Sequence, residues 1–343
     1  MEKSLRNGSV PHIYSIDAPC KINLHLAIGA KRPDGFHEVL SIFTALSLAD
    51  TLHFERLGTG STASFEVRWD IGGAGMKSSV DPLFHTEKNL VLQALALFRR
   101  ETGFDGSFAI RLDKRIPLGA GLGGGSSDAA ATLTALNLLS GSKLPLHALR
   151  EMAAVLGSDV PFFIDCNASG YGGTALVTGR GETVEPLSMP QEWVLLVSPP
   201  FASTTAEAFR LLDEARASGF TAREAGKKSG LDKEALIEAL AGDPRTWPFF
   251  NDFLPVFVEF APTVGENGSK EARIRADTYR TVLTSLYEAG ALFAGLSGSG
   301  STCFGVFSGK DAAWHAKNTI LAAKNTVNLT FVLAQSASPI LKC

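Results

Sequence analysis

The spacing of apolar residues divides the chain into segments typical of strands and segments typical of helices. Residues 13–28 alternate loosely between apolar and polar side chains, as expected for two strands interrupted near Pro19. Residues 39–54 form a more continuous apolar run, which indicates a buried strand. The pattern therefore begins with β-structure, and it predicts more of it later in three segments: 108–117, two or three strands within 171–198, and Cys303–Phe307.

Leucine and alanine recur at helical spacing between these strands. The predicted helices cover 89–100, where Asn89 is a candidate N-cap, the stretch after Asp128, and 146–156, which Gly157 ends. Further helices are expected after Thr205 and in the charged surface segment 215–245. Because Pro161 disfavours helical backbone just before it, we expect Asp159 to lie in a turn ahead of an apolar strand.

Composition identifies an ordinary folded protein. With 343 residues, 45% of them apolar, the chain is long enough for two domains, and the change of pattern after residue 170 divides it into 1–170 and 171–343. The segment 57–80, rich in Gly, Ser and Thr, is expected to be a surface loop or hairpin within the first of these. A net charge of −3 gives no reason to expect binding to nucleic acid or to acidic membranes.

No targeting or membrane signal is evident. No apolar run reaches the roughly 18 residues that span a bilayer, and the first 15 residues lack the apolar core of a signal peptide. The cysteines are far apart in the sequence, which argues against structural zinc and a disulfide framework: Cys20, Cys166, Cys303 and Cys343. A cytoplasmic location is the default expectation.

The chemistry is concentrated in one glycine-rich stretch, PLGAGLGGGSSDAAATL, from Pro117 to Leu133. Glycine adopts positive φ and lets backbone amides approach a bulky ligand. Helix-forming sequence follows immediately, with Ser126, Ser127 or Asp128 as N-cap or first-turn residue. Free amides at the positive end of a helix bind anions, so the stretch predicts a phosphate-binding loop.

Other phosphate-loop motifs fit this stretch less well. A dinucleotide-binding strand–turn–helix unit requires an acidic residue about 20 positions further on, and none lies near residue 140. The P-loop pattern needs a lysine before Ser126, and the companion motifs of protein kinases are absent from the chain. A flexible Gly-Ser linker would not normally run directly into an alanine-leucine helix.

The glycine stretch resembles the nucleotide loop of the GHMP kinases, and two other segments resemble the motifs that accompany it. Pro19-Cys20-Lys21-Ile22-Asn23-Leu24 is similar to the first motif, and the glycine turn 296–302 is similar to the third. Gly157–Phe163 matches the family's Gly-x-Asp-Val-Pro-Phe segment. Three motifs in the expected order are far more specific than one glycine loop. The resemblance implies a two-domain α+β fold, with a ribosomal-S5-like N-terminal half that binds ATP and a ferredoxin-like C-terminal half that binds substrate.

The resemblance also implies a role for individual residues. Asp159 would accept the proton of the substrate hydroxyl, and Lys21 would keep Asp159 ionised and stabilise the transferring phosphoryl group. The implied ATP site contains Pro117, Gly119, Gly121, Leu122, Gly123, Gly124, Gly125, Ser126 and Ser127, with a serine hydroxyl meeting phosphate or Mg²⁺. The implied substrate site contains Asn23, Phe36, His37, Phe43, Thr205 and Phe209.

The longer form of the glycine motif is similar to the branch of the family whose substrate is a cytidine diphosphate-linked polyol. That branch usually has tyrosine where this chain has Phe36, so a hydroxyl is missing here. For Phe43, plain core packing is the alternative interpretation, and for Lys114 and Arg115 phosphate neutralisation and solvated edge charges are equally compatible with the sequence. The role of the pair Asn251-Asp252, which also matches the family, is left undefined by the sequence.

Two other functions stay open at this point. A GHMP kinase for a mevalonate-like or homoserine-like alcohol would share the ATP site but lack an aromatic pocket for a base. A GHMP-fold sensor would bind ligand without turnover, and the presence of both Lys21 and Asp159 argues against it. The sequence does not predict the oligomeric state.

Overall fold

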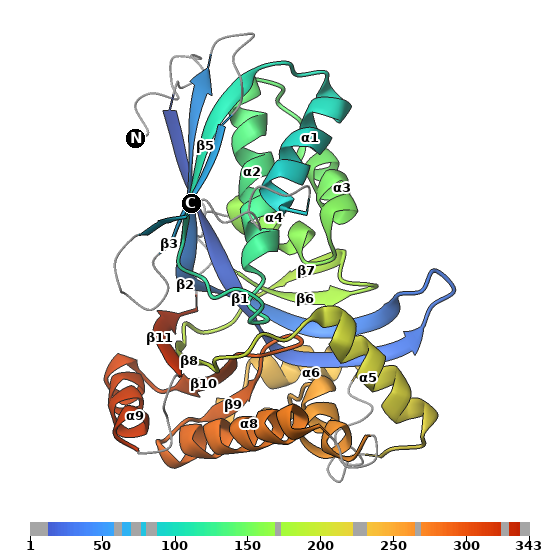
Figure 1. Ribbon diagram of the computed structural model, residues 1–343, viewed down its shortest axis with the longest axis vertical. Helices are drawn as coiled ribbons and strands as arrows, with labels where there is room; N and C mark the ends of the chain where they lie inside the picture. The colour runs from blue at the N-terminus through green and yellow to red at the C-terminus, as the bar shows by residue number, and fades with distance from the viewer. Residues whose placement is uncertain are drawn as a thin grey trace.

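The computed structural model describes residues 13–57, 64–69, 77–79, 88–168, 173–221, 232–264, 269–323 and 329–336. Figure 1 shows a larger sheet with helices beside it in the N-terminal half and a smaller sheet with its own helices in the C-terminal half. The predictions that concern the N-terminal 12 residues, Cys343 and parts of the segments 57–80 and 215–245 lie outside the described residues. None of the helices in the described ranges is long and apolar enough to span a bilayer.

The larger sheet takes in seven of the described strands, in the order β4-β3-β5-β2-β6-β7, with β1 paired to β2. Their bounds are β1 (Ile13–Lys31), β2 (His37–Leu57), β3 (Ser64–Trp69), β4 (Lys77–Ser79), β5 (Ser107–Lys114), β6 (Thr174–Thr178) and β7 (Thr183–Leu187). The two predicted strands around Pro19 are in fact one long strand, β1, whose register with β2 shifts between Pro19 and Lys21. Proline has no N–H to donate, so an irregularity in the ladder accommodates it without ending the strand.

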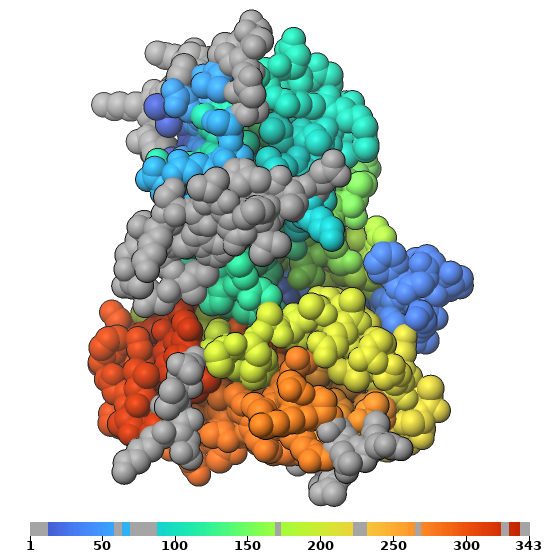
Figure 2. All heavy atoms as spheres, viewed as in Figure 1, coloured from blue at the N-terminus to red at the C-terminus, as the bar shows by residue number. Residues whose placement is uncertain are grey.

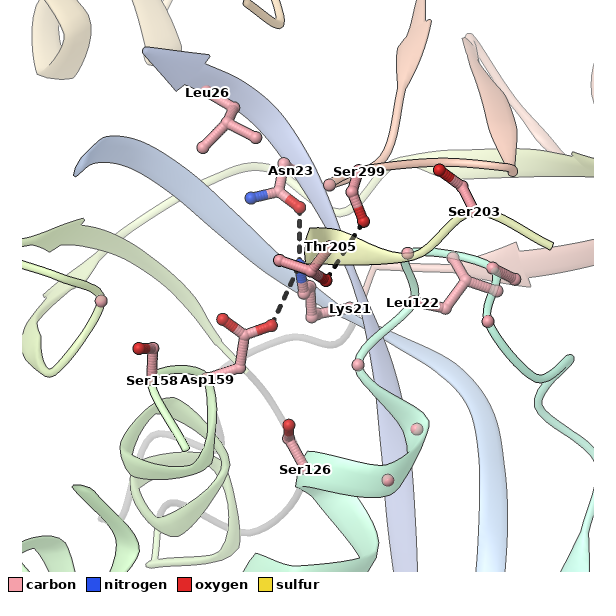
Figure 3. A pocket seen from close by; sticks show the side chains of 18 of the residues that line it. Lys21, Asn23, Leu26, Leu122, Ser126, Ser158, Asp159, Ser203, Thr205 and Ser299 are labelled. Atoms are coloured by element: carbon pink, nitrogen blue, oxygen red, sulfur yellow. Dashed lines mark hydrogen bonds and ion pairs between the residues drawn. The ribbon is translucent and has the colours of Figure 1, made fainter. Parts of the chain in front are cut away.

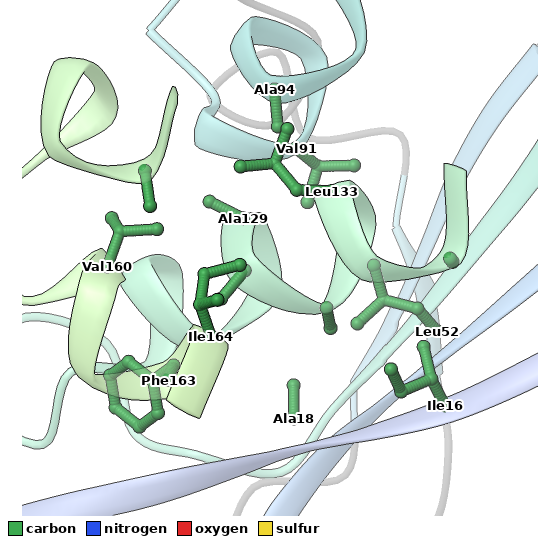
Figure 4. Close-up of a cluster of buried hydrophobic side chains, with 14 of the residues drawn as sticks. Ile16, Ala18, Leu52, Val91, Ala94, Ala129, Leu133, Val160, Phe163 and Ile164 are labelled. Atoms are coloured by element: carbon green, nitrogen blue, oxygen red, sulfur yellow. The ribbon is translucent and has the colours of Figure 1, made fainter. Parts of the chain in front are cut away.

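Four helices accompany this sheet: α1 (Leu90–Thr102), α2 (Gly124–Ser140), α3 (Leu146–Leu156) and α4 (Val160–Ala168). Asn89 caps α1 as predicted, because its side chain accepts a hydrogen bond from the N–H of Val91. The apolar faces of the helices and of the sheet enclose the first core, part of which Figure 4 shows. Leu133 on α2 and Phe163 on α4 are completely buried there.

The strand predicted after Asp159 is wrong, because Val160–Ala168 is the helix α4. Pro161 is the second residue of this helix, where a backbone N–H would have no partner within the helix. Proline is therefore compatible with the first helical turn, and the apolar run that follows is buried on the helix rather than in a strand.

The smaller sheet is antiparallel in the order β11-β8-β10-β9. Its strands are β8 (Trp193–Ser198), β9 (Phe293–Leu296), β10 (Cys303–Phe307) and β11 (Thr330–Gln335). The helices of this half are α5 (Thr205–Ala217), α6 (Lys233–Leu240), the single turn α7 (Phe253–Pro255), α8 (Lys270–Glu288) and α9 (Lys310–Ala322). Apolar residues of α5, α8, α9 and the sheet enclose the second core.

A third cluster, the bridging core, joins the halves. Leu24 and Ile42 of the larger sheet meet Leu196 and Phe304 of the smaller sheet in it. Strand β1 contributes to all three clusters, with Ile16 and Ala18 in the first core, Cys20, Ile22 and Leu24 in the bridging core, and Leu26 and Ile28 in the second core. The domain boundary predicted at residue 170 stays a prediction. The strands that follow it, β6 and β7, still pair within the larger sheet.

The far end of the β1–β2 hairpin stands out from the edge of the molecule, beside the segment that contains α5 (Figure 2). Arg216 of α5 donates hydrogen bonds to the carbonyl groups of Ile28 and Gly29. His37, at the start of β2, is 2.8 Å from the Asp213 carboxylate, measured between Nε2 and Oδ1. The hairpin is thus held to the C-terminal half, and a cavity lies at this junction.

Candidate active site

A cavity of about 500 Å³ opens where the glycine stretch, the start of α4, the β1–β2 hairpin and α5 meet. This volume is suited to a small-molecule ligand. Of the residues that the sequence assigned to a site, these line it: Lys21, Asn23, Phe36, His37, Phe43, Pro117, Gly119, Gly121, Leu122, Gly123, Gly124, Gly125, Ser126, Asp159, Thr205 and Phe209. Ser127 does not. Segments far apart along the chain are therefore brought to one cavity, part of which Figure 3 shows.

The glycines of this stretch present their backbone to the cavity. Gly119, Gly121 and Gly123 have φ angles of 59°, 74° and 71°, the left-handed region that glycine adopts without strain. Gly123 is the N-cap of α2, and no side chain caps this helix. The N–H groups of the first turn are thus left for an anion, and the helix dipole favours one there.

The two serines that follow differ in position. Ser126 lines the cavity at the start of α2 (Figure 3), so its hydroxyl group can meet a ligand. Ser127 is buried within the fold, and its N–H donates to the carbonyl of Gly123. Asp128 is also buried, four residues beyond the first residue of α2, so its predicted alternative as N-cap is wrong. These positions favour Ser126 over Ser127 as the hydroxyl for phosphate or Mg²⁺.

Lys21 and Asp159 form an ion pair in the lining of the cavity. The ammonium Nζ of Lys21 lies 3.4 Å from Oδ2 of Asp159, and it also donates to Oδ1 of Asn23 at 2.6 Å (Figure 3). The Lys21 side chain is only 4% exposed, whereas that of Asp159 is 32% exposed. Asn23 is fixed in turn by a hydrogen bond to the hydroxyl of Ser41. The arrangement holds one cation in a fixed place and leaves the carboxylate open to a ligand.

An aromatic pair forms another wall of the cavity. The rings of His37 and Phe209 are stacked, with centroids 4.9 Å apart and planes inclined by 23°. The Phe36 ring is 47% exposed, and the guanidinium carbon of Arg180 lies 5.0 Å from its centroid. Thr205 is hydrogen-bonded to Ser299 of the third motif at 3.4 Å between hydroxyl oxygens. A flat, uncharged ring system is the natural ligand for such a wall.

Phe43 lies deeper than these residues. It is 3% exposed, belongs to the first core and meets Phe162 edge to face, with ring centroids 5.3 Å apart. The ammonium of Lys21 lies 4.4 Å from its centroid. Phe43 therefore packs in the core and supports Lys21 through a cation–π contact, while part of its ring still borders the cavity.

Beneath the glycine stretch lies a buried ion triad that sequence reasoning missed. Lys114 Nζ donates to carboxylate oxygens of both Asp50 and Asp128, and all three side chains are at most 4% exposed. Asp50 also accepts hydrogen bonds from the N–H groups of Arg115 and Ile116. The predicted solvated edge charge is therefore wrong for Lys114. Arg115 does not line the cavity, and its side chain donates to Thr51.

The triad is tightly coupled electrostatically. Burial, and beyond it the charge of Asp50, raises the pKa of Asp128 to about 7, although Lys114 opposes this shift. Burial alone would lower the pKa of Lys114, but the Asp128 and Asp50 carboxylates raise it above its ordinary value. Lys114 therefore stays charged, and the triad ties the end of β5 to the first turns of α2, on either side of the glycines 119–125.

The third motif packs directly against the glycine stretch. The hydroxyl of Ser297 donates to the carbonyl of Gly121 at 2.9 Å, and the N–H of Thr302 donates to the carbonyl of Ala120 at 3.1 Å. The carboxamide of Asn251 donates to the carbonyls of Leu296 and Gly298, at 2.8 Å each. Asn251, left without a role by the sequence, is thus a structural link between the motif and the end of β1.

The cavity lining includes residues that sequence reasoning did not single out, among them Ser158, Arg180, Ser203 and Ser299. Ser158 precedes Asp159, and Ser299 lies inside the third motif, so both were within segments that the motif matches had marked. Arg180 lies in the turn Gly179-Arg180-Gly181 between β6 and β7, in a segment for which the sequence predicted strands and no site residue.

The donor atoms of the cavity suit a magnesium ion held mainly by phosphate and water. Within the described residues, no group of three or more His, Cys, Asp or Glu side chains could hold a metal ion. The cavity lining offers the hydroxyl of Ser126 and the carboxylate of Asp159. Magnesium commonly keeps several waters and binds through one or two protein oxygens plus substrate phosphates, so these residues fit it.

Comparison with known families agrees with this geometry. The sequence model of the GHMP kinases N terminal domain matches residues 89–173, and that of the GHMP kinases C terminal domain matches residues 255–324. The first of these segments contains the glycine stretch and Asp159, and the second contains the third motif.

Several similar proteins carry one name. A protein of Treponema pallidum (strain Nichols) is 37% identical over 85% of this chain and 89% of its own length, and one of Rhodococcus jostii is 38% identical over 89% and 87%. Both are named 4-diphosphocytidyl-2-C-methyl-D-erythritol kinase. The chloroplastic protein of that name from Oryza sativa is 36% identical over 84% of this chain, which spans only 63% of the rice protein's length.

Solved structures show the same fold. A crystal structure of 4-(cytidine 5'-diphospho)-2C-methyl-D-erythritol kinase matches 95% of this chain and all of its own, with a TM-score of 0.67 and 29% identity. A homoserine kinase from Cytophaga hutchinsonii (TM-score 0.60, 18% identity) and the mevalonate kinase of L. major (0.65, 14%) share the fold over 96% and 95% of this chain.

Proposed function

This chain belongs to the GHMP kinases and, within them, to the 4-diphosphocytidyl-2-C-methyl-D-erythritol kinases, and we propose that it phosphorylates the 2-hydroxyl group of that polyol with ATP. The product would be the 2-phosphate, an intermediate of the non-mevalonate route to isoprenoid precursors. The observation that carries this proposal is one cavity bordered by three features: a helix N-terminus without a side-chain cap, a lysine–aspartate pair and a stacked aromatic wall.

The ATP phosphates bind at the glycine stretch. Phosphoryl transfer depends mainly on positioning and on neutralising charge, so amides held by Gly119, Gly121 and Gly123 are suitable ligands. The hydroxyl of Ser126 would hold Mg²⁺ together with the phosphates, and the ion would further neutralise their charge when bound. In this assignment the ATP site lies within residues 1–170, and residues 171–343 complete the substrate site.

Asp159 takes the proton from the 2-hydroxyl group of the substrate. Its partly exposed carboxylate is the acidic side chain that borders the cavity beside Lys21. The Lys21 ammonium, held by Asn23, lies beside the Asp159 carboxylate and faces the oxygen on which negative charge develops during transfer. Because Lys21 is already oriented, little reorganisation accompanies the reaction.

The cytosine end of the substrate binds against the aromatic wall. His37 and Phe209 offer a stacked pair, and Phe36 adds a further exposed ring. Stacking on a base contributes roughly 1–3 kcal/mol in nucleic-acid sites. A mevalonate-like or homoserine-like alcohol has no ring to place on this wall, and this favours the cytidyl compound.

The test offers the cytidyl substrate, mevalonate and homoserine to the purified protein at equal concentration, with ATP and Mg²⁺, and records ADP release. We expect ADP release with the cytidyl compound only. ADP release with mevalonate or homoserine and none with the cytidyl compound would make it a different GHMP kinase. Tight binding of the cytidyl compound without any ADP release would make it a sensor.

A further inference from the structure

The cations that line the cavity differ in how their charge is balanced. The ammonium of Lys21 pairs with Asp159, and that of Lys114 is shared between Asp50 and Asp128. Arg180 is the third, and no carboxylate in the described ranges forms an ion pair with its guanidinium group. Its guanidinium group donates to the carbonyl of Ala154 at 3.3 Å, a neutral acceptor, and the Glu182 carboxylate accepts a hydrogen bond from the backbone N–H of Arg180.

Backbone contacts fix Arg180 on the side of the cavity where the polyol substrate is proposed to bind. Its neighbours Gly179 and Gly181 have φ angles of 72° and 121°, so the turn between β6 and β7 is tight. The carbonyl of Gly179 accepts a hydrogen bond from the N–H of Val39 on β2. A Cβ atom on Gly181 would lie 2.8 Å from Cβ of Ser158, so this turn packs directly against the residue before Asp159.

The guanidinium group of Arg180 also lies over the aromatic wall, 5.0 Å from the Phe36 ring centroid. A planar guanidinium stacks on an aromatic face and still presents its edge N–H groups to a ligand. Phe36 carries no hydroxyl, so its ring serves here as an apolar platform. Arg180 therefore lies between the base wall on one side and the Ser158-Asp159 turn on the other.

We propose that Arg180 binds the diphosphate group of the acceptor substrate. This inference rests on the proposed function, in which the diphosphate connects the cytidine held by the aromatic wall to the polyol beside Asp159. That group must cross the interval where Arg180 lies. A guanidinium matches phosphate oxygens with two parallel hydrogen bonds, and an unpaired cation at this place offsets the charge of the diphosphate.

Steady-state kinetics of Arg180→Gln tests the proposal. We expect the KM for the cytidyl substrate to rise at least tenfold and the KM for ATP to stay within twofold of the unmodified protein. Arg180→Lys keeps the charge but not the planar guanidinium group, so its KM for the cytidyl substrate should lie between those of the unmodified protein and Arg180→Gln. Arg245→Gln is the matched control, because it removes one exposed arginine that does not line the cavity. An unchanged KM for the cytidyl substrate, or a selective rise in the KM for ATP, would overturn the proposal.

Calorimetry separates contact with the diphosphate from support of the aromatic wall. With the ATP site filled by a non-hydrolysable analogue, cytidine 5'-diphosphate should bind Arg180→Gln at least tenfold more weakly, and cytidine should bind it as it binds the unmodified protein. Equal losses for both ligands would assign Arg180 to the wall and overturn the diphosphate contact. If the unmodified protein neither binds cytidine 5'-diphosphate nor releases ADP with the cytidyl substrate, the proposed function fails together with this inference. If the unmodified protein phosphorylates the cytidyl substrate and Arg180→Gln has the same KM and the same affinity for cytidine 5'-diphosphate, this inference fails and the proposed function stands.

Discussion

At the scale of single residues, the cavity joins a buried cation to an accessible carboxylate. Lys21 is enclosed by Asn23, Phe43 and the glycine stretch, and a Cβ on Gly123 would come within 3.1 Å of its Cγ. Asp159 lies in the turn just before α4 and keeps part of its surface toward the cavity. The lysine is therefore held in place by its surroundings, and the carboxylate is accessible from the cavity.

Replacing the carboxylate should abolish turnover without disturbing the fold. In Asp159→Asn we expect kcat to fall by about 10²-fold or more, the usual contribution of a general base, with the KM for ATP little changed. Asp165→Asn is the matched control on α4, the helix that follows Asp159, because Asp165 pairs with Arg150 and does not line the cavity. Near-normal turnover in folded Asp159→Asn protein would show that another group accepts the proton.

A buried histidine on β1 should make stability depend on pH. Burial lowers the pKa of His25 from 6.5 to about 4, and its Nδ1 accepts a hydrogen bond from the N–H of Phe250. The neutral ring is therefore favoured in the folded state. The difference in pKa between the unfolded and folded states corresponds to on the order of 3 kcal/mol in the free energy of unfolding. This contribution is fully present above pH 6.5 and is lost as the pH falls from 6.5 to about 4.

Urea unfolding at a series of pH values measures this effect. His25→Asn keeps an acceptor but no group that titrates in this range, so its stability should fall less than that of the unmodified protein between pH 6.5 and 4. Parallel curves for the two proteins would mean that His25 takes up its proton equally in the folded and unfolded states.

At the scale of elements, the glycine stretch is shaped as much by the third motif as by its ligand. A Cβ on Gly121 would lie 2.1 Å from the carbonyl oxygen of Ser297 and 2.8 Å from that of Gly300. The turn 296–302 thus leaves room for backbone only at this position. At Gly121 the absence of a side chain is therefore required by loop-to-loop packing, in addition to the proposed approach of phosphate to the stretch.

Gly121→Ala should therefore destabilise the protein by about 2 kcal/mol or more, since it combines a left-handed φ with a backbone clash. Gly125→Ala is the matched control for folding. Gly125 lies inside α2, and an added Cβ would meet only the Cδ1 of Leu90, at 3.6 Å. Alanine favours helix over glycine, so this variant should keep or raise the midpoint of urea unfolding. Equal losses of stability in both variants would contradict the loop-packing account.

Local sequence predicted most elements but not the contacts between distant ones. The N-cap at Asn89, the end of the helix at Gly157 and the glycine stretch are local features, and the structure has them where the sequence puts them. The strand prediction after Asp159 failed because proline disfavours helical backbone at the residue before it but is compatible with the first turn of a helix, where Pro161 lies in α4.

The missed parts of the site depend on partners far away in the sequence. Lys114 finds Asp50 across 64 positions, so neither the burial of the lysine nor its pairing could be read from neighbouring residues. Arg180 and Asn251 acquire their positions only when the turns that carry them meet the β1–β2 hairpin or the third motif. A pattern of apolar positions specifies which face of an element is buried and says nothing about which polar group lies opposite.

At the scale of the whole molecule, two sheets are joined by a bridging core and by polar links around the cavity. Asn251 is the most connected of these links, because its amide donates to two carbonyls of the third motif and its oxygen accepts from the N–H of Phe253. The adjacent Asp252 accepts from the N–H of Ile28 at the end of β1. The glycine turn of one half and the long strand of the other are thereby fixed to the same pair of residues.

Asn251→Ala should weaken both the fold and the ATP site. Removing the amide leaves the buried carbonyls of Leu296 and Gly298 without this donor, at a cost of about 3 kcal/mol in urea unfolding. Because this turn abuts Gly121, we also expect weaker ATP binding by calorimetry. Asn137→Ala, which loses two hydrogen bonds to Leu144 outside the cavity, should lower stability and leave ATP affinity intact. Unchanged ATP affinity in Asn251→Ala would restrict its role to stability.

The passage of β1 through all three cores has a consequence for the protein during its synthesis on the ribosome. The second half of β1 emerges before the C-terminal half, yet Ile28 cannot bind Asp252 until that residue is made, 224 residues later. At about 5–20 residues per second that interval is on the order of 10–45 seconds. For this time Leu26 and Ile28 lack the core that buries them, so the nascent chain presents an apolar strand end to chaperones. A release of the chain before Asp252 is made would leave that strand permanently exposed and prone to aggregate.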